Sequence, residues 1–208
     1  MRELPLLLAS ASPRRREILA TLGLAFVVAP VDADERELPG ETPAAYLSRV
    51  VEAKLTLARD VALGGDHSGV IVADTTVVLD ERMLAKPLDP DENRRMVRAL
   101  AGRAHHVMTR FAVHARGGET HAETVTTEVV VRPLDDDAIA RYVASGEGRD
   151  KAGGYAIQGL GAFAVRAIHG SYSNVVGLPA CEVVVALQAL GLLGAFPLAP
   201  DRGRDEEP

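Results

Sequence analysis

Strand-like and helix-like patterns alternate along most of this 208-residue chain. Short runs rich in Val, Ile and Leu are followed by longer stretches with apolar residues at helical spacing, and turn residues separate the two. This alternation is typical of α/β proteins, in which helices pack against the faces of a sheet. We therefore expect an α/β fold with a mixed sheet and flanking helices, arranged as two lobes about a cleft.

These patterns place the individual elements. The strands are predicted at Pro5–Ala9, Phe26–Ala29, Val70–Ala73, Thr76–Leu79, His105–His114, Glu123–Val131 and Phe163–Ile168. The helices are predicted at Ser12–Leu22, Thr42–Leu63, Asp91–Leu100, Leu134–Ser145 and Leu178–Leu193. The two long strands beside Gly117-Gly118 are expected to pair antiparallel. Residues 1–195 are expected to form one domain, and residues 196–208 a Pro-rich, charged and disordered tail.

Charge and composition exclude several classes of protein. The 29 acidic and 23 basic residues give a net charge of -6, which argues against a protein that coats nucleic acid or an anionic membrane. Aromatic residues are only 4% of the chain, which argues against a general nucleic-acid-binding module. No apolar stretch approaches the roughly 20 residues that span a bilayer. The lone Cys181, expected in the core, can form no internal disulfide, which fits a reducing, cytoplasmic location.

Lysine is rare in this chain. Of the 23 basic residues only three are lysines, at Lys54, Lys86 and Lys151. A lysine ammonium is a compact point charge without the planar fork of arginine, so these positions are candidates for a requirement that arginine cannot meet. Chance survival on solvated faces is the alternative.

The first candidate site lies where Ser10-Ala11-Ser12-Pro13-Arg14-Arg15 joins a strand to a helix. Free backbone N–H groups at a helix N-terminus favour an anion. Two arginines in the first turn oppose the helix dipole, which is intelligible if a phosphate sits among them. A capped helix with solvated arginines is the alternative.

The second candidate is Asp74, which with Thr75 interrupts a β-rich run. Ligands gather at strand ends in open α/β sheets, so we expect the Asp74 carboxylate to hold a divalent metal or to activate water. An aspartate that only begins a turn is the alternative. The segment Leu84-Ala85-Lys86-Pro87 is expected to bring Lys86 back to the same strand edge.

The third candidate is the segment from Gly146 to Gly161, which holds six glycines around Gln158. Glycines let the backbone approach a ligand closely, and a lone glutamine offers a donor and an acceptor to a base edge or a phosphate. A flexible connector is the alternative. The chain contains no Walker A loop, no Gly-x-Ser-x-Gly and no His-Glu-x-x-His.

Taken in order, these segments resemble the Maf family of nucleoside triphosphate pyrophosphatases over about residues 4–193. The residues that carry the resemblance are Leu8 to Arg15, Glu35, Lys54, Ala73-Asp74-Thr75, Lys86-Pro87, Asp150-Lys151-Ala152-Gly153, Tyr155, Ile157-Gln158-Gly159 and Asn174 to Pro179. Ala85 and Leu55 depart from the residues usual in the family, which leaves the preference among bases open.

The resemblance implies an elongated α/β fold similar to inosine triphosphate pyrophosphatases, usually as a homodimer. It also implies hydrolysis of dTTP or UTP to a nucleoside monophosphate and pyrophosphate with Mg²⁺ or Mn²⁺. By motif match Asp74 would accept a proton, and Glu35 and Asp74 would hold the metal. The phosphate region would be lined by Ser10, Arg14, Arg15, Lys54 and Lys86, and base specificity would be set by Arg14, Thr75 and Gln158.

A nucleotide-sensing regulator of cell division is the competing interpretation. In that case the same pocket would bind a nucleotide without significant turnover and pass the signal to a partner in septum formation. Turnover of purified protein separates the two functions.

Overall fold

The computed structural model describes residues 4–198 of the chain. Its centre is a seven-stranded sheet with the order β2-β1-β3-β5-β6-β7, and β4 pairs with β3 off this path. The strands are β1 (Leu6–Leu8), β2 (Phe26–Val28), β3 (Gly69–Leu79), β4 (Arg82–Leu84), β5 (Ala104–Ala115), β6 (Thr120–Val131) and β7 (Val165–His169). The helices are α1 (Pro13–Thr21), α2 (Pro43–Leu63), α3 (Pro90–Leu100), α4 (Asp136–Ser145), α5 (Tyr172–Val176) and α6 (Ala180–Ala189). Residues 199–208 of the expected tail lie outside the described residues.

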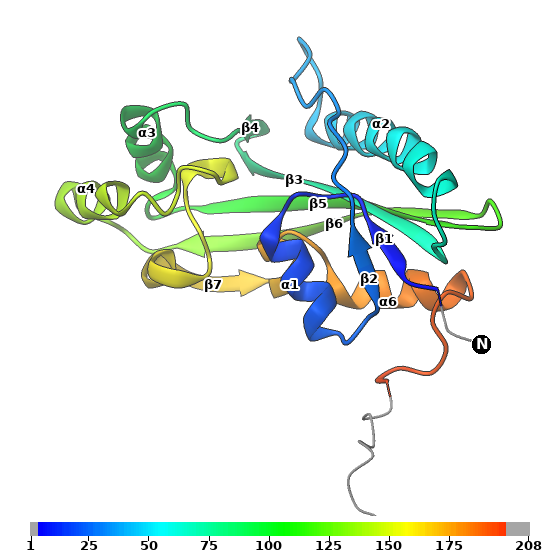
Figure 1. Cartoon of the computed structure of the whole chain (residues 1–208). Coiled ribbons are helices and arrows are strands. Elements are labelled where there is room, and N and C mark those ends of the chain that lie inside the picture. The colour runs from blue at the N-terminus through cyan, green and yellow to red at the C-terminus, as the bar shows by residue number, and fades with distance from the viewer. Residues whose placement is uncertain (1–3, 199–208) are drawn as a thin grey trace, which may run out of the picture.

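The sheet is mixed, as the sequence predicts. β1 runs parallel to β2 and β3, whereas the remaining pairs are antiparallel. The long strands β3, β5 and β6 lie side by side at the centre of the molecule in Figure 1. As expected, β5 pairs with β6 across the turn at Gly117-Gly118. Ser12 and Thr42 cap α1 and α2, each followed by a proline in the first turn. The division into two lobes stays a prediction.

β3 is one continuous strand, so the predicted interruption at Asp74 is wrong. Every residue from Gly69 to Val78 has a partner on β5. This ladder of backbone hydrogen bonds carries the strand through the polar side chain. Asp74 therefore lies in the middle of a strand rather than at its end.

The C-terminal helix differs from the prediction. α6 begins after Pro179 and ends at Ala189, so it is shorter than the predicted Leu178–Leu193. The chain turns away at Gly191, whose φ of +67° a helix does not allow. Cys181, expected in the core, is exposed on the first turn of this helix.

The Gly-rich region also forms more local structure than expected. Short 3₁₀ helices occupy Ala152–Gly154 and Gly159–Ala164. The strand predicted from Phe163 therefore begins only at Val165. The five residues of α5 form a short helix that the sequence pattern did not indicate.

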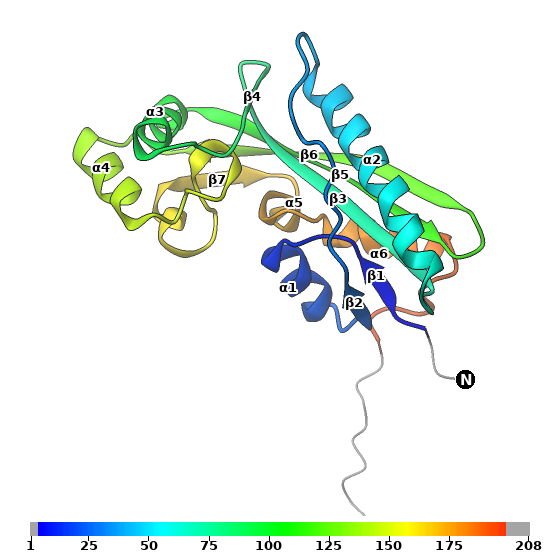
Figure 2. The ribbon, with the colours of Figure 1, turned by 45° about the horizontal axis from the view of Figure 1, so that its top comes forward.

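Helices cover both faces of the sheet, as Figures 1 and 2 show: α2 lies on one face, and α1 and α6 lie on the other. Alternation along β3 explains the two layers, because successive side chains point to opposite faces. Val72 packs with Val51 of α2. Ile71 packs in a second cluster with Leu19 of α1 and Leu187 of α6. Within residues 4–198, none of the helices has both the length and the apolar character needed to cross a membrane.

One edge of β3 contains a gap that positions the functional site. β1 pairs with this edge only at Val70 and Ile71, and β4 pairs with it only at residues 77–79. Between them, residues 72–76 have no strand partner on that side. Asp74, Thr75 and Thr76 of this gap line a pocket, in the kind of crevice where α/β sheets bind ligands.

His105 is the histidine of the sheet with the most strongly shifted pKa. It is buried in β5, with Nε2 2.7 Å from the Tyr155 hydroxyl and with Nδ1 lacking a hydrogen-bond partner among the described residues. Burial, with a smaller contribution from His106, lowers the pKa of His105 from 6.5 to about 4.

We predict that His105 makes stability depend on pH. Between about pH 6.5 and 4 the unfolded chain binds a proton that the folded protein excludes, so acidification removes up to about 3 kcal/mol of the free energy of unfolding. Urea denaturation of the wild-type protein and of His105→Gln across this range measures the contribution. The variant should show the shallower pH dependence, and equal slopes would contradict the assignment to His105.

Candidate functional site

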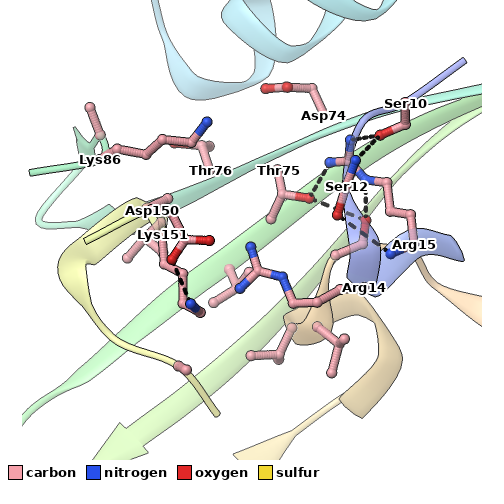
Figure 3. A pocket seen from close by; sticks show the side chains of 18 of the residues that line it. Ser10, Ser12, Arg14, Arg15, Asp74, Thr75, Thr76, Lys86, Asp150 and Lys151 are labelled. Atoms are coloured by element: carbon pink, nitrogen blue, oxygen red, sulfur yellow. Dashed lines mark hydrogen bonds and ion pairs between the residues drawn. The ribbon is translucent and has the colours of Figure 1, made fainter. Parts of the chain in front are cut away.

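A pocket of about 930 Å³ lies beside the gap in β3 (Figure 3). Its walls come from the junction of β1 and α1, the acidic loop before α2, α2 itself, β3, the segment after β4 and the Gly-rich region. It is lined by all the residues that the sequence singled out, namely Ser10, Arg14, Arg15, Glu35, Lys54, Asp74, Thr75, Lys86 and Gln158. A pocket of this size can enclose a small organic ligand. Which of these residues bind or react stays a prediction.

Arg15 connects the segments that meet at the gap. Its Nε donates to Gly177 O at 2.8 Å, and its Nη1 donates to Ala73 O at 2.9 Å. Further bonds run from Nη1 to Ser10 Oγ at 3.2 Å and from Nη2 to Thr75 Oγ1 at 3.1 Å. Four acceptors thus engage a group that has five N–H donors. Ala73 O belongs to the unpaired edge of β3, so the guanidinium satisfies a carbonyl that a neighbouring strand would otherwise bind.

Arg14 and Arg15 are adjacent in sequence but have different surroundings. Arg15 is buried, and burial lowers its pKa against the opposing charges of Asp74 and Glu35. Arg14 is half-buried and extends into the pocket in Figure 3. Successive helical residues point about 100° apart, and here Arg15 turns toward its buried acceptors while Arg14 extends into the pocket. Arg14 is therefore the better candidate to bind the expected anion, because Arg15 keeps only one N–H without a hydrogen bond among residues 4–198.

Lys54 holds two carboxylates together. Its Nζ lies 2.7 Å from Asp74 Oδ1 and 2.6 Å from Glu35 Oε1. Lys54 and Asp74 are buried, whereas the Glu35 side chain is 46% exposed. Burial tends to raise the pKa of Glu35, but the hydrogen bond and charge of Lys54, with Lys86 and Arg15 behind it, lower that pKa overall. Glu35 is thus held as a carboxylate at the mouth of the pocket.

The donor set fits a divalent cation that is shared with a ligand. Within residues 4–198 no three His, Cys, Asp or Glu side chains are grouped as a metal site. Glu35 and Asp74 do offer hard oxygen donors at one place, where Lys54 contacts only one oxygen of each. Mg²⁺ is commonly bound by one or two carboxylates, with phosphate oxygens and water completing the shell. The pair can therefore hold such an ion together with a phosphorylated ligand.

The acidic loop that carries Glu35 is fastened to α2 by two residues that sequence reasoning missed. The Tyr46 hydroxyl donates to Glu35 O at 3.1 Å. The Arg49 guanidinium binds both oxygens of Glu41 at 2.7 Å and donates to Arg36 O at 2.8 Å. Tyr46 and Arg49 lie three residues apart and so share a face of α2, which was the available signal.

Lys86 reaches the pocket through a tight hairpin. The turn between β3 and β4 has positive φ at both central residues, Asp80 (49°) and Glu81 (65°), which suits a two-residue connection. Neither Lys86 nor Arg14 forms an ion pair within the described part of the chain. Lys151, by contrast, is paired with Asp150 at 2.6 Å. The positive charges of Arg14 and Lys86 are thus available to an anionic ligand.

The Gly-rich segment is packed rather than a loose connector. Gly153 N donates to Ala85 O at 3.1 Å, and Asn93 Nδ2 of α3 donates to Gly154 O at 2.7 Å. A Cβ on Gly154 would lie 2.1 Å from Asn93 Nδ2, so the close approach requires glycine. Gln158 follows these anchored glycines in the chain and is exposed along the pocket wall.

Comparison with known proteins gives consistent matches. The family model described as Maf-like protein matches residues 5–190. A protein named dTTP/UTP pyrophosphatase from Geobacter sp. (strain M21) is 46% identical over 195 residues, covering 93% of this chain and 100% of that protein. One of the same name from Anaeromyxobacter dehalogenans (strain 2CP-1 / ATCC BAA-258) is 48% identical over 200 residues, covering 95% of this chain and 97% of that protein. A solved dITP/XTP pyrophosphatase from Mycobacterium abscessus matches 62% of this chain and 73% of that chain at 18% identity with a TM-score of 0.33, too low to carry an argument.

We predict that Arg15→Lys is strongly destabilising. An ammonium cannot reach acceptors on three separate segments, at Ser10, β3 and Gly177, so buried oxygens lose their donors and the free energy of unfolding falls by about 3 kcal/mol. Arg14→Lys is the matched control and should change stability by less than about 0.5 kcal/mol, because its side chain faces the pocket. Urea denaturation compares the two. Equal effects would contradict the distinct positions of these neighbours.

Proposed function

The chain belongs to the Maf-like protein family, and on this premise we propose that it is a nucleoside triphosphate pyrophosphatase acting on dTTP and UTP. Relatives with that name match it over nearly the whole length of both chains. The observation that best supports the proposal is that Arg14 and Lys86, two cations without ion pairs in the described part of the chain, share one pocket with the carboxylates of Glu35 and Asp74. Attack on a triphosphate requires both kinds of group.

The proposed reaction is hydrolysis between the α- and β-phosphates. A water oxygen bonds to the α-phosphorus, and the bond from that phosphorus to the bridging oxygen breaks. The nucleoside monophosphate and pyrophosphate are the products. Asp74 is proposed to accept the proton of the attacking water, because Lys54 contacts only its Oδ1.

Four cations of the pocket are proposed to have different roles in binding the substrate. Arg14 and Lys86 bind phosphate oxygens directly, since their charges are not neutralised within the described chain. Lys54 keeps Glu35 and Asp74 close together despite their like charges. Arg15 is proposed to be a positioning residue, because its hydrogen bond orients the Ser10 hydroxyl at the edge of the pocket.

A divalent cation is proposed to act with these residues. Glu35 and Asp74 are the side chains that would hold it together with the phosphates. When bound, Mg²⁺ or Mn²⁺ supplies charge neutralisation for the pyrophosphate leaving group.

Base selection is proposed to involve Arg14, Thr75 and Gln158. Gln158 can both donate and accept, as recognition of a base edge requires. The Thr75 hydroxyl is already bonded by Arg15 at 3.1 Å and lies 2.9 Å from Thr109 Oγ1, so we propose that Thr75 contributes through the shape of the pocket. A homodimer is a further proposal from the family resemblance, and a cytoplasmic location is proposed from the single cysteine.

We predict that Asp74→Asn strongly lowers turnover while nucleotide binding persists. Without a proton acceptor, kcat for dTTP should fall at least about 100-fold. Pyrophosphate release is measured with dTTP, UTP, CTP, GTP, ATP and 7-methyl-GTP, each with Mg²⁺ or Mn²⁺. Asp66→Asn makes the same chemical change at an exposed residue away from the pocket and is the control.

The outcomes separate the two functions. Rapid dTTP and UTP hydrolysis that is lost in Asp74→Asn supports the enzyme. Full turnover in Asp74→Asn at saturating metal would remove the aspartate from the mechanism. Nucleotide binding without turnover by the wild-type protein would favour the sensor of cell division.

A further inference from the structure

Glu147 lines the pocket at the start of the Gly-rich segment. It follows α4 directly, after Gly146 ends that helix in a left-handed conformation with φ of 74°. Its carboxylate accepts two consecutive backbone N–H groups, Leu160 N on Oε1 and Gly161 N on Oε2, each at 2.7 Å. A carboxylate that binds two N–H groups makes stronger hydrogen bonds than a neutral acceptor.

The chain approaches Glu147 closely at Gly159. This glycine has φ of +69°, and a Cβ built there would lie 2.2 Å from Glu147 Oε1. A side chain at this position would displace the carboxylate from its two N–H donors. Glu147 and Gly159 are therefore matched in shape as well as in hydrogen bonding.

The same helix also anchors the other end of the segment. The hydroxyl of Tyr142 in α4 accepts Ala156 N at 3.0 Å. The stretch from Ala156 to Gly161 is thus attached at one end to α4 and at the other end to the residue just beyond it. Gln158 lies between the two attachments and lines the pocket.

We propose that Glu147 is a positioning residue that sets base discrimination by fixing the backbone that directly follows Gln158. The inference rests on the proposed function in one respect, namely that the pocket receives a nucleotide whose base meets Gln158. Glu147 itself need not touch the substrate. Replacing its carboxylate by an amide leaves one acceptor and turns an NH₂ group toward a backbone N–H, so at least one of the two bonds is lost.

The experiment measures kcat/KM for dTTP and CTP in wild type, Glu147→Gln, Gln158→Ala and the double variant. We expect Glu147→Gln to lower the dTTP-to-CTP ratio about tenfold, mainly by raising KM for dTTP. The double variant should discriminate no worse than Gln158→Ala alone, because both changes remove the same interaction. Glu119→Gln, an exposed glutamate in the turn between β5 and β6, is the charge-matched control.

Tyr142→Phe provides an independent variant if Glu147→Gln does not fold. It frees the N–H of Ala156 at the other end of the segment and should shift the ratio in the same direction. An equal fall for both nucleotides, with the ratio within twofold of wild type, would overturn the inference. So would a wild-type protein that does not discriminate between these bases.

Binding separates failure of this inference from failure of the proposed function. Calorimetry with non-hydrolysable analogues of dTTP and CTP reports discrimination in the absence of turnover. A wild-type protein that discriminates in binding but does not hydrolyse, with discrimination lost in Glu147→Gln, would refute the enzyme and retain the role of Glu147. Hydrolysis with discrimination unchanged in Glu147→Gln would do the reverse.

Discussion

The buried guanidinium of Arg15 is the interaction on which the site depends. It binds carbonyl oxygens of Ala73 and Gly177 and the hydroxyls of Ser10 and Thr75, and so connects β3, the start of α1 and the chain before α6. A sheet edge without a partner normally leaves backbone groups unpaired. Here arginine supplies a donor at that edge, which allows a pocket to open in the middle of a strand.

Charge is arranged in the pocket by a second buried cation. Lys54 draws Glu35 from a loop and Asp74 from a strand to the same ammonium group. Two carboxylates so close together would repel each other without it. Arg14 and Lys86 face the same space without carboxylate partners in the described chain, so a single pocket offers paired anions and available cations. This combination suits an anionic ligand that brings a metal with it.

Elements with strong local signals could be predicted from the sequence. Ser12 and Thr42, each before a proline, begin helices where expected, because capping involves only neighbouring residues. The continuity of β3 through Asp74 was not predictable in this way, because it depends on the β5 ladder. The anchoring roles of Tyr46 and Glu147 were missed for the same reason. Each acts on backbone that is distant in sequence, 11 residues away for Tyr46 and 13 or 14 for Glu147.

The amino-acid sequence alone specifies which side chains are available for chemistry, including three rare lysines and a glutamine among glycines. It also determined the mixed α/β character and the family resemblance, since both reside in local patterns and short motifs. Folding is what turns Arg15 toward its buried acceptors while Arg14 faces the pocket. The two are equivalent as neighbours in a helix. They differ because the acceptors of Arg15 are 58 and 162 residues away, at Ala73 and Gly177, and only folding brings them together.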